Sequence, residues 1–405
     1  MPALVRFNTT LPTPNKVREN DLAASLVVPP TRLAIRAWAQ RLTVEGREHV
    51  VADQPCLILA NHASLMDPLS ILLTAPRYAQ FMATQSLFNG RLGQILAWWG
   101  VVPKKKFTVD SRAIRLLKGW TDVGSPVALF PEGQRTWDGR PLPLLDGIEK
   151  LVRLLGAPVV TARIYNADRV WPRWAPAPRR GRVHVVFDPP RSFARREDVQ
   201  VIRDFIAQGI QVDPDAHRYT VRGRNLAVGL SNVLFACPAC QAVEALKERA
   251  DQLGCSECGG RWTVDTTNHL TPTGGGEPLS IAAAWDAVQA GFAERDWITD
   301  LDRHRDDGVI LESKPVALFD VTDELPVAVG KGRIVLTRDG LRLDGEGSWS
   351  IGMDALRSVS AEQRDRLYFF TKDRCYEPIM PDESVVKWEL ITDHWRRRAL
   401  VAEPG

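Results

Sequence analysis

The segment LILANHASLMDP, residues 57–68, places a histidine and an aspartate on one short stretch of chain. An apolar run precedes His62, and Asp67 stands directly before Pro68. Because imidazole accepts a proton near neutral pH and a carboxylate can fix its tautomer, the pair could act as a general base and its orienting partner. The structural alternative is an aspartate that forms the N-cap of a helix starting at Pro68, beside an unrelated histidine.

A second stretch, VALFPEGQRTWDG at residues 127–139, repeats this arrangement of an apolar run followed by a polar turn. The turn contains Glu132, Gly133 and Arg135. Ligand sites of open α/β sheets lie beyond the carboxyl ends of the strands, so two parallel strands would bring both turns to one edge. The planar guanidinium of Arg135 suits a phosphate, although it could equally form a surface salt bridge.

Four of the six cysteines form a third cluster, written CPAC, fourteen residues, then CSEC. Four thiolates at this spacing can close a tetrahedral site, which is typical of structural rather than catalytic zinc. Gln241 replaces the glycine often found after the first pair. The sequence therefore predicts a zinc ribbon with the ligands Cys237, Cys240, Cys255 and Cys258.

The elements that must position the first two turns alternate between strand and helix patterns. Alternation of this kind predicts an α/β domain with a central, mostly parallel sheet, ending near residue 226. Strands are expected at 42–50, 55–60, 126–131, 158–164 and 182–188, and helices at 31–41, 68–75, 109–122, 145–155 and 198–210.

The remaining residues divide into three further segments. A zinc ribbon is expected at 227–270, and a linker with a helix over 279–298 is expected at 271–306. In the last segment, 307–405, GRIVLTRDGLRLD predicts a hairpin turning at Asp339 and Gly340. Short strands followed by one amphipathic helix over 382–398 predict an α+β module, which resembles pleckstrin-homology or GRAM domains.

The first two motifs together resemble a known family. NHASLMD is the His-x4-Asp motif, and FPEGQR is similar to the FPEG-x-R motif, of glycerolipid acyltransferases such as the 1-acylglycerol-3-phosphate acyltransferases. Both motifs follow expected strands, are in the family's order and lie about 70 residues apart. LTVEGREHV at 42–50 and GAPVVTARI at 156–164 also resemble family segments, so the resemblance covers roughly residues 30–212.

The resemblance implies transfer of a fatty acyl group from acyl-CoA or acyl-carrier protein to a lysophospholipid hydroxyl, giving phosphatidic acid from 1-acylglycerol 3-phosphate. His62 would be the catalytic base and Asp67 its partner. No metal or redox cofactor is expected in this step, because the thioester supplies the activation. The acceptor would be bound by Glu132, Gly133, Arg135 and Lys106.

Two positions depart from the family pattern. Lys106 stands where an arginine is usual, which keeps the positive charge without the bidentate fork. Thr161 stands where a proline is usual. Both changes leave acyl transfer plausible and put the identity of the acceptor in question.

Net charge limits the kinds of partner that can be expected. Residues 1–226 hold 32 Lys and Arg against 19 Asp and Glu, a net +13, whereas the rest of the chain holds 20 against 30, a net −10. A basic half favours anionic partners, including lipid head groups. The ribbon and the C-terminal segments are acidic, so nucleic acid is not expected as a partner.

The sequence predicts a cytoplasmic protein peripherally associated with the membrane. No apolar run is long enough to span a bilayer, and the start lacks a signal-peptide pattern. The two isolated cysteines, Cys56 and Cys375, are expected in the core, which fits a reducing compartment. Tryptophan beside basic residues suggests lipid contact at 31–42, 96–106 and, as the best candidate, 171–180.

A second hypothesis of another class is a catalytically silent lipid-binding scaffold. Keeping both His62 and Asp67 beside an intact PEG-x-R favours the enzyme, because a scaffold has no chemical need for the pair.

Overall fold

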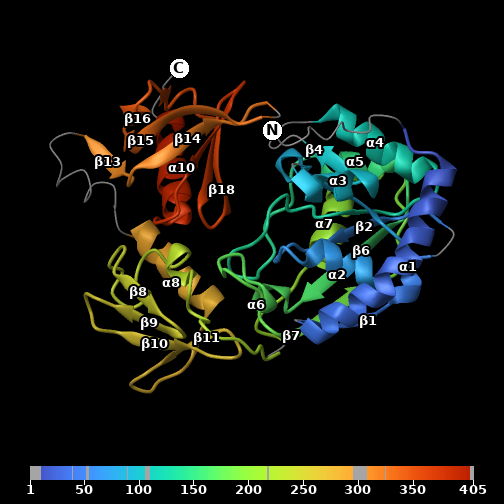
Figure 1. Cartoon of the computed structure of the whole chain (residues 1–405), viewed down its shortest axis with the longest axis horizontal. Coiled ribbons are helices and arrows are strands. Elements are labelled where there is room, and N and C mark those ends of the chain that lie inside the picture. Colours follow the sequence, from blue (N-terminus) through green and yellow to red (C-terminus); the bar gives the residue numbers. More distant parts are fainter. Residues whose placement is uncertain are drawn as a thin grey trace. The chain divides into compact units, whose positions relative to one another are not determined.

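The structure, a computed structural model, describes residues 11–38, 40–51, 54–88, 90–104, 110–216, 219–294, 308–323 and 325–401. The chain forms two compact units (Figure 1). The first unit comprises Met1–Pro172 and Ala177–Gly223, and the second comprises Arg173–Pro176 and Arg224–Gly405.

The first unit is built on a seven-stranded sheet. Every pairing in it is parallel except β6–β7, so the predicted mostly parallel sheet is confirmed as a mixed sheet. In spatial order the strands are β1 (Gln40–Glu45), β7 (Gly181–Phe187), β6 (Val159–Tyr165), β2 (Leu57–Ala60), β5 (Val127–Leu129), β3 (Gln80–Thr84) and β4 (Val102–Lys104).

Strand β2 shows why the apolar runs form the centre of this sheet. Successive strand residues point to opposite faces, and a strand covered on both sides must be apolar throughout. Leu57 and Leu59 belong to a core shared with α4 (Ser111–Asp122), α5 (Ile148–Leu155) and α7 (Val199–Gly209). Ile58 and Ala60 belong to another core, shared with α2 (Asp67–Thr74), α3 (Gly90–Trp98) and α6 (Ala167–Val170).

The N-terminal helix differs most from the prediction. Helix α1 (Pro14–Trp38) begins well before residue 31 and continues through Pro29 and Pro30, which read as helix breakers in the sequence. Its inner face is anchored by polar contacts: Asn20 Nδ2 donates to Trp99 O at 3.0 Å, and Asp21 pairs with Arg77 at 3.1 Å. These contacts hold the part of the helix before the two prolines against the rest of the first unit.

Other boundaries also differ. The strand expected over 42–50 ends at Glu45 and is followed by the 3-10 turn η1 (Arg47–His49). The helix expected to reach residue 41 gives way to β1 at Gln40. The short elements β3, β4, α3, α6 and η2 (Gln85–Phe88) were not predicted.

The second unit begins with the short turn η3 (Leu230–Asn232) and a small antiparallel sheet in the cysteine-rich segment. Its strands are β8 (Leu246–Arg249), β9 (Gln252–Cys255), β10 (Arg261–Val264), β11 (His269–Pro272) and β12 (Leu279–Ser280). Helix α8 (Ile281–Glu294) comes directly after β12. The spacing predicts that Trp285, Val288 and Phe292 share one face; Trp285 and Val288 are buried there, and Phe292 is half-buried.

The described residues of the C-terminal part of this unit form an eight-stranded antiparallel sheet and the helix α10 (Val385–Val401). The predicted hairpin is confirmed, but its turn lies at Arg338 and Asp339, one residue before the predicted position, and Gly340 begins β16. The helical spacing predicts that α10 buries Val385, Trp388, Ile391 and Trp395; the first three are buried, and Trp395 is half-buried. The strands are β13 (Val309–Glu312), β14 (Val316–Asp320), β15 (Val327–Thr337), β16 (Gly340–Glu346), β17 (Ser350–Gly352), β18 (Ser358–Gln363), β19 (Arg366–Phe370) and β20 (Cys375–Ile379).

Candidate active site

The two polar turns meet at the carboxyl edge of the sheet of the first unit. Strands β2 and β5 are parallel neighbours, with Leu57 opposite Val127 and Leu59 opposite Leu129. The main chain of His62 bridges the turns: its N–H donates to Glu132 Oε1 at 2.7 Å, and its carbonyl accepts from Thr136 N at 2.9 Å. The prediction that the motifs lie together is therefore confirmed.

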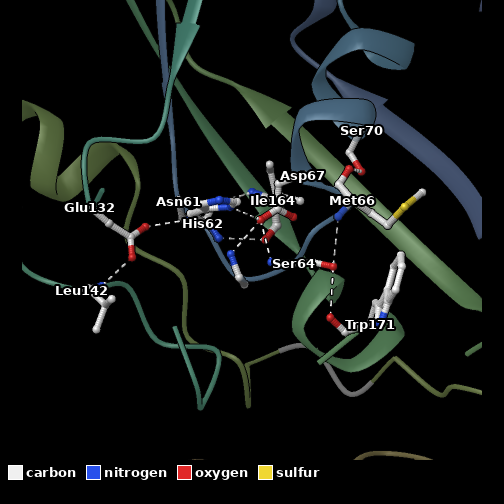
Figure 2. Close-up of polar contacts among 11 residues, drawn as sticks. Asn61, His62, Ser64, Met66, Asp67, Ser70, Glu132, Leu142, Ile164 and Trp171 are labelled. Atoms are coloured by element: carbon white, nitrogen blue, oxygen red, sulfur yellow. Dashed lines mark hydrogen bonds and ion pairs between the residues drawn. The ribbon is translucent and has the colours of Figure 1, made fainter. Parts of the chain in front are cut away.

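His62 and Asp67 form a direct pair (Figure 2). His62 Nδ1 lies 2.8 Å from Asp67 Oδ2, and the side chain of Asp67 is fully buried whereas that of His62 is 18% exposed. The imidazole also stacks on Phe130, with ring centroids 4.1 Å apart and planes 18° apart. A carboxylate on one side and an aromatic face on the other fix both the tautomer and the plane of the ring.

Asp67 does not act as the predicted N-cap. Helix α2 starts at Asp67 itself, its N-cap residue is Met66, and no side chain caps its first turn. Instead Asp67 Oδ2 points back and accepts from Ala63 N and Ser64 N, each at 2.7 Å, as well as contacting His62. The carboxylate thereby organises the turn that carries the histidine, because three donors converge on one oxygen.

Two residues that the sequence reasoning did not single out hold this turn to the rest of the unit (Figure 2). Asn61, 2% exposed, accepts from Ile164 N at 2.7 Å and donates to Ile164 O at 3.1 Å, which extends the β2–β6 pairing beyond the last ladder pair at Ala60. Ser64 Oγ donates to Trp171 O at 3.1 Å. The sequence contained one indication of this role for Asn61: its carboxamide follows directly after the apolar run 57–60.

Glu132 is buried, with 3% of its surface exposed, and both of its oxygens are used. Oε1 accepts from His62 N, and Oε2 accepts from Leu142 N at 2.6 Å. Burial raises the pKa of Glu132 to about 8, the charge of Asp67 adds to this rise, and the two backbone donors oppose it. The carboxyl group lies between two segments of main chain.

The other expected acceptor-binding residues are placed only in part. Gly133 adopts a left-handed φ of 74° in the turn after β5, where its N–H donates to Phe130 O at 3.1 Å; a side chain there would also meet Leu145. Arg135 is half-buried in the same loop. Lys106 lies outside the described residues.

The four clustered cysteines converge in the second unit. Their sulfurs all lie within 4.8 Å of one another, with 3.8 Å between Cys237 and Cys258 and 3.7 Å between Cys240 and Cys255. Zinc–sulfur bonds of about 2.3 Å in a regular tetrahedron place the sulfurs about 3.8 Å apart, so the donors fit zinc.

Gln241, which replaces the usual glycine after the first cysteine pair, keeps the left-handed conformation, with φ 62°. Its Nε2 donates to Ala287 O on α8 at 2.9 Å. The departure from the ribbon pattern therefore ties the first cysteine pair to the next helix.

The segment 171–180 was expected to be the best membrane contact, and this prediction is wrong because most of the segment is buried or half-buried. Arg173 and Trp174 are buried, at 5% and 1% exposure, within the second unit, and the Arg173 guanidinium donates to the carbonyls of Ala361 and Glu362. The prolines prevent a regular helix or strand in this segment, but they do not prevent its burial. Burial of Arg173 is possible because its guanidinium donates to carbonyl groups on the edge strand β18. In the part of the chain that the structure describes, no helix has the length and apolar character to cross a bilayer.

Comparison with known proteins confirms the predicted resemblance. Residues 41–165 match the family model described as acyltransferase. The chloroplastic 1-acyl-sn-glycerol-3-phosphate acyltransferase BAT2 of Brassica napus is 29% identical over 133 residues, which cover 32% of this chain and 38% of the relative. The human 1-acyl-sn-glycerol-3-phosphate acyltransferase beta is 27% identical over 131 residues, covering 30% of this chain and 46% of the relative.

The matches to these relatives span less than half of their length. Among solved structures, the 1-acyl-sn-glycerophosphate acyltransferase PlsC from Thermotoga maritima aligns over 48% of this chain and 79% of that chain, with 23% identity and a TM-score of 0.42.

Proposed function

We propose that this chain, whose residues 41–165 match the acyltransferase family, transfers a fatty acyl group from a thioester to the hydroxyl of a lysophospholipid. The observation that carries the proposal is the 2.8 Å contact between His62 Nδ1 and buried Asp67 Oδ2 at the carboxyl edge of the sheet. The relatives are named for 1-acylglycerol 3-phosphate, so we take it as the acceptor and phosphatidic acid as the product.

The chemistry depends on this pair. With Nδ1 donating to Asp67, the lone pair of a neutral imidazole lies on Nε2. Nε2 takes the proton of the acceptor hydroxyl as its oxygen attacks the thioester carbonyl, and the imidazolium returns the proton to the departing thiolate. Asp67 stabilises the imidazolium between these two steps. An ester bond forms and a carbon–sulfur bond breaks, with no covalent enzyme intermediate.

The acceptor phosphate is assigned to the loop after β5. Arg135 lies two residues after Gly133 in this loop and supplies a fork of N–H donors that matches phosphate oxygens. Lys106 would add positive charge. The donor is acyl-CoA or acyl-carrier protein, since the site chemistry is the same for both thioesters.

Peripheral membrane association is supported by exposed apolar side chains on two helices of the first unit. Leu22, Leu26 and Leu33 on α1 are 64%, 69% and 69% exposed, and on α3 Ile95 and Trp98 are 54% and 56% exposed. Exposed leucines with a tryptophan suit a lipid interface, where they would bring the site to its acceptor.

The second unit is proposed to hold one structural zinc ion through Cys237, Cys240, Cys255 and Cys258, because four sulfurs close a tetrahedron without an open position. The ion would stabilise the fold and take no part in acyl transfer. The pleckstrin-homology or GRAM resemblance of the C-terminal sheet and helix also stays a proposal.

The test is acyl transfer from labelled acyl-CoA and from acyl-carrier protein to a panel of lysophospholipids and glycerol 3-phosphate, with wild type and His62→Ala. Activity that is lost in the variant, while its thermal unfolding is unchanged, supports the enzyme. If wild type and variant are both inactive yet bind anionic vesicles equally, the chain is a lipid-binding scaffold.

A further inference from the structure

We infer that Glu132 is a positioning residue that holds the main chain of His62 in place, and not a ligand of the acceptor. The inference rests on the proposed acyl-transfer function and departs from the acceptor-binding role that the family resemblance implied. The position of the proposed base, His62, would depend on Glu132.

The carboxyl group of Glu132 has no oxygen left to face a substrate. Oε1 accepts from His62 N at 2.7 Å and Oε2 accepts from Leu142 N at 2.6 Å, while the residue is 3% exposed. Both donors are backbone N–H groups, from the turn after β2 and from the loop after β5. A side chain in this position joins two loops.

The loop that supplies Glu132 is itself closed. Leu145 N donates to Pro131 O at 2.9 Å, so the segment 131–145 begins and ends at the same place. Glu132 Oε2 holds this segment together internally through Leu142. A rigid loop gives the carboxylate a fixed position from which to hold His62.

The main chain of His62 is fixed on both sides. The Glu132 carboxylate binds its N–H, and Thr136 N donates to its carbonyl at 2.9 Å. Asn61, the preceding residue, is clamped to Ile164 by two hydrogen bonds. The direction of the imidazole depends on this main-chain placement, and a displacement of about 1 Å at a reacting group can cost a factor of about 100 in rate.

The hydrogen-bonding chemistry of the acceptor supports the same role. The expected acceptor carries a phosphate, which is recognised by N–H donors, and a glutamate side chain has none. Phosphate recognition in this loop falls to Arg135, three residues after Glu132. The two residues of one motif therefore have separable roles.

The first test is steady-state kinetics of Glu132→Gln with the acceptor varied. Glutamine has one accepting oxygen, so its amide N–H₂ must face one of the two backbone donors. We expect kcat to fall about 10- to 100-fold, with the KM for the acceptor within about threefold of wild type. A KM for the acceptor raised about tenfold with kcat unchanged would overturn the inference.

Two further variants are compared with Glu132→Gln. Arg135→Gln is expected to raise the KM for the acceptor, which is the opposite pattern. Glu149→Gln is the matched control, because Glu149 is also a buried glutamate of the first unit, 6% exposed, but pairs with Arg203 at 3.1 Å. Its kcat should equal that of wild type; an equal loss would mean that any buried charge in this unit has the effect, and would overturn the inference.

Hydrogen exchange of the peptide covering residues 57–66 separates this inference from the proposed function. We expect the His62 amide to exchange at least about tenfold faster in Glu132→Gln, whether or not the chain turns over substrate. Unchanged exchange would overturn the inference even in an active enzyme. If Glu132→Gln does not fold, Glu132→Asp, which keeps the carboxyl group but shortens the reach, must show the same faster exchange and lower kcat.

Discussion

A single oxygen atom, Asp67 Oδ2, supports both the fold and the chemistry of the candidate site. It accepts from two backbone N–H groups and contacts His62 Nδ1, while Asp67 Oδ1 is buried and has no hydrogen-bond partner among the described residues. The structural and electrostatic parts of this role can be separated by substitution.

Asp67→Asn should keep the fold and lose activity. An asparagine oxygen in the place of Oδ2 still accepts from all three donors, but it lacks the charge that stabilises an imidazolium. We expect kcat to fall by about 10² to 10⁴. The free energy of unfolding should fall by only about 1 kcal/mol, because the new amide N–H₂ takes the place of the buried Oδ1, which has no partner among the described residues. Asp67→Ala, by contrast, leaves the N–H groups of Ala63 and Ser64 unpaired and should lower that free energy by about 2 kcal/mol. Equal kcat for wild type and Asp67→Asn in acyl transfer would contradict the assigned role.

The pH dependence of stability should report on Glu132. Its pKa is raised from 4.5 to about 8, chiefly by burial, so the folded chain binds this proton more tightly than the unfolded chain. The contribution to stability is therefore present below about pH 4.5 and is lost as the pH rises through about 8.

Glu132→Gln does not titrate, which isolates this contribution. We expect the free energy of unfolding of wild type, relative to Glu132→Gln, to decrease between about pH 5 and about pH 8 and then to level off. Urea unfolding at a series of pH values measures the difference. A difference that rises below about pH 4.5 and stays flat between about pH 5 and about pH 8 would mean that the backbone donors outweigh burial and that the pKa is lowered.

At the scale of elements, the close approach of α7 to β6 depends on a glycine. A Cβ at Gly209, the last residue of α7, would lie 2.3 Å from Thr161 Oγ1 and 2.5 Å from Thr161 Cβ on β6. Thr161 is itself fixed, since Oγ1 donates to Asp188 Oδ2 at 2.8 Å. Thr161, which stands where the family usually has a proline, therefore fits against α7 because Gly209 has no side chain.

Gly209→Ala should therefore destabilise the first unit by about 2 kcal/mol, because neither the helix nor the fixed threonine can move without cost. Gly274→Ala is the control: a Cβ there meets nothing within 4 Å, and its effect should stay within about 0.5 kcal/mol. Chemical denaturation of both variants measures the two changes. Similar values for both would show that α7 can shift freely on β6.

At the scale of the whole molecule, the proposed zinc site belongs to the second unit alone. All four cysteines lie within Arg224–Gly405, and Gln241 links the first cysteine pair to α8. Metal binding to a site that the unfolded chain lacks contributes directly to folding stability.

Removal of zinc should consequently destabilise the second unit and leave the first unchanged. We expect about one zinc ion per chain by elemental analysis, and a lower unfolding temperature for one of two calorimetric transitions after chelation. Cys240→Ser should reproduce the effect of the chelator. A chain that binds no zinc, or two transitions that shift together, would contradict this assignment.

Several features could be predicted from the sequence by itself because they depend on neighbouring residues. The apolar run 57–60 and the motif around His62 predicted strand β2 and its polar turn, and the helical spacing of Val385, Trp388 and Ile391 predicted the buried face of α10. Cysteine spacing likewise predicted a four-sulfur cluster, since two short knuckles bring the thiols together.

Only the tertiary structure decided the rest, because it depends on contacts between residues far apart in the chain. The role of Glu132 comes from a hydrogen bond to His62, 70 residues away, which exists because β2 and β5 are neighbours. Burial of Trp174 was missed for the same reason: local composition favoured a loop, but the residue is buried within the second unit, whose other residues begin at Arg224. Residue types and spacing predicted which groups could react, and strand order determined which of them meet.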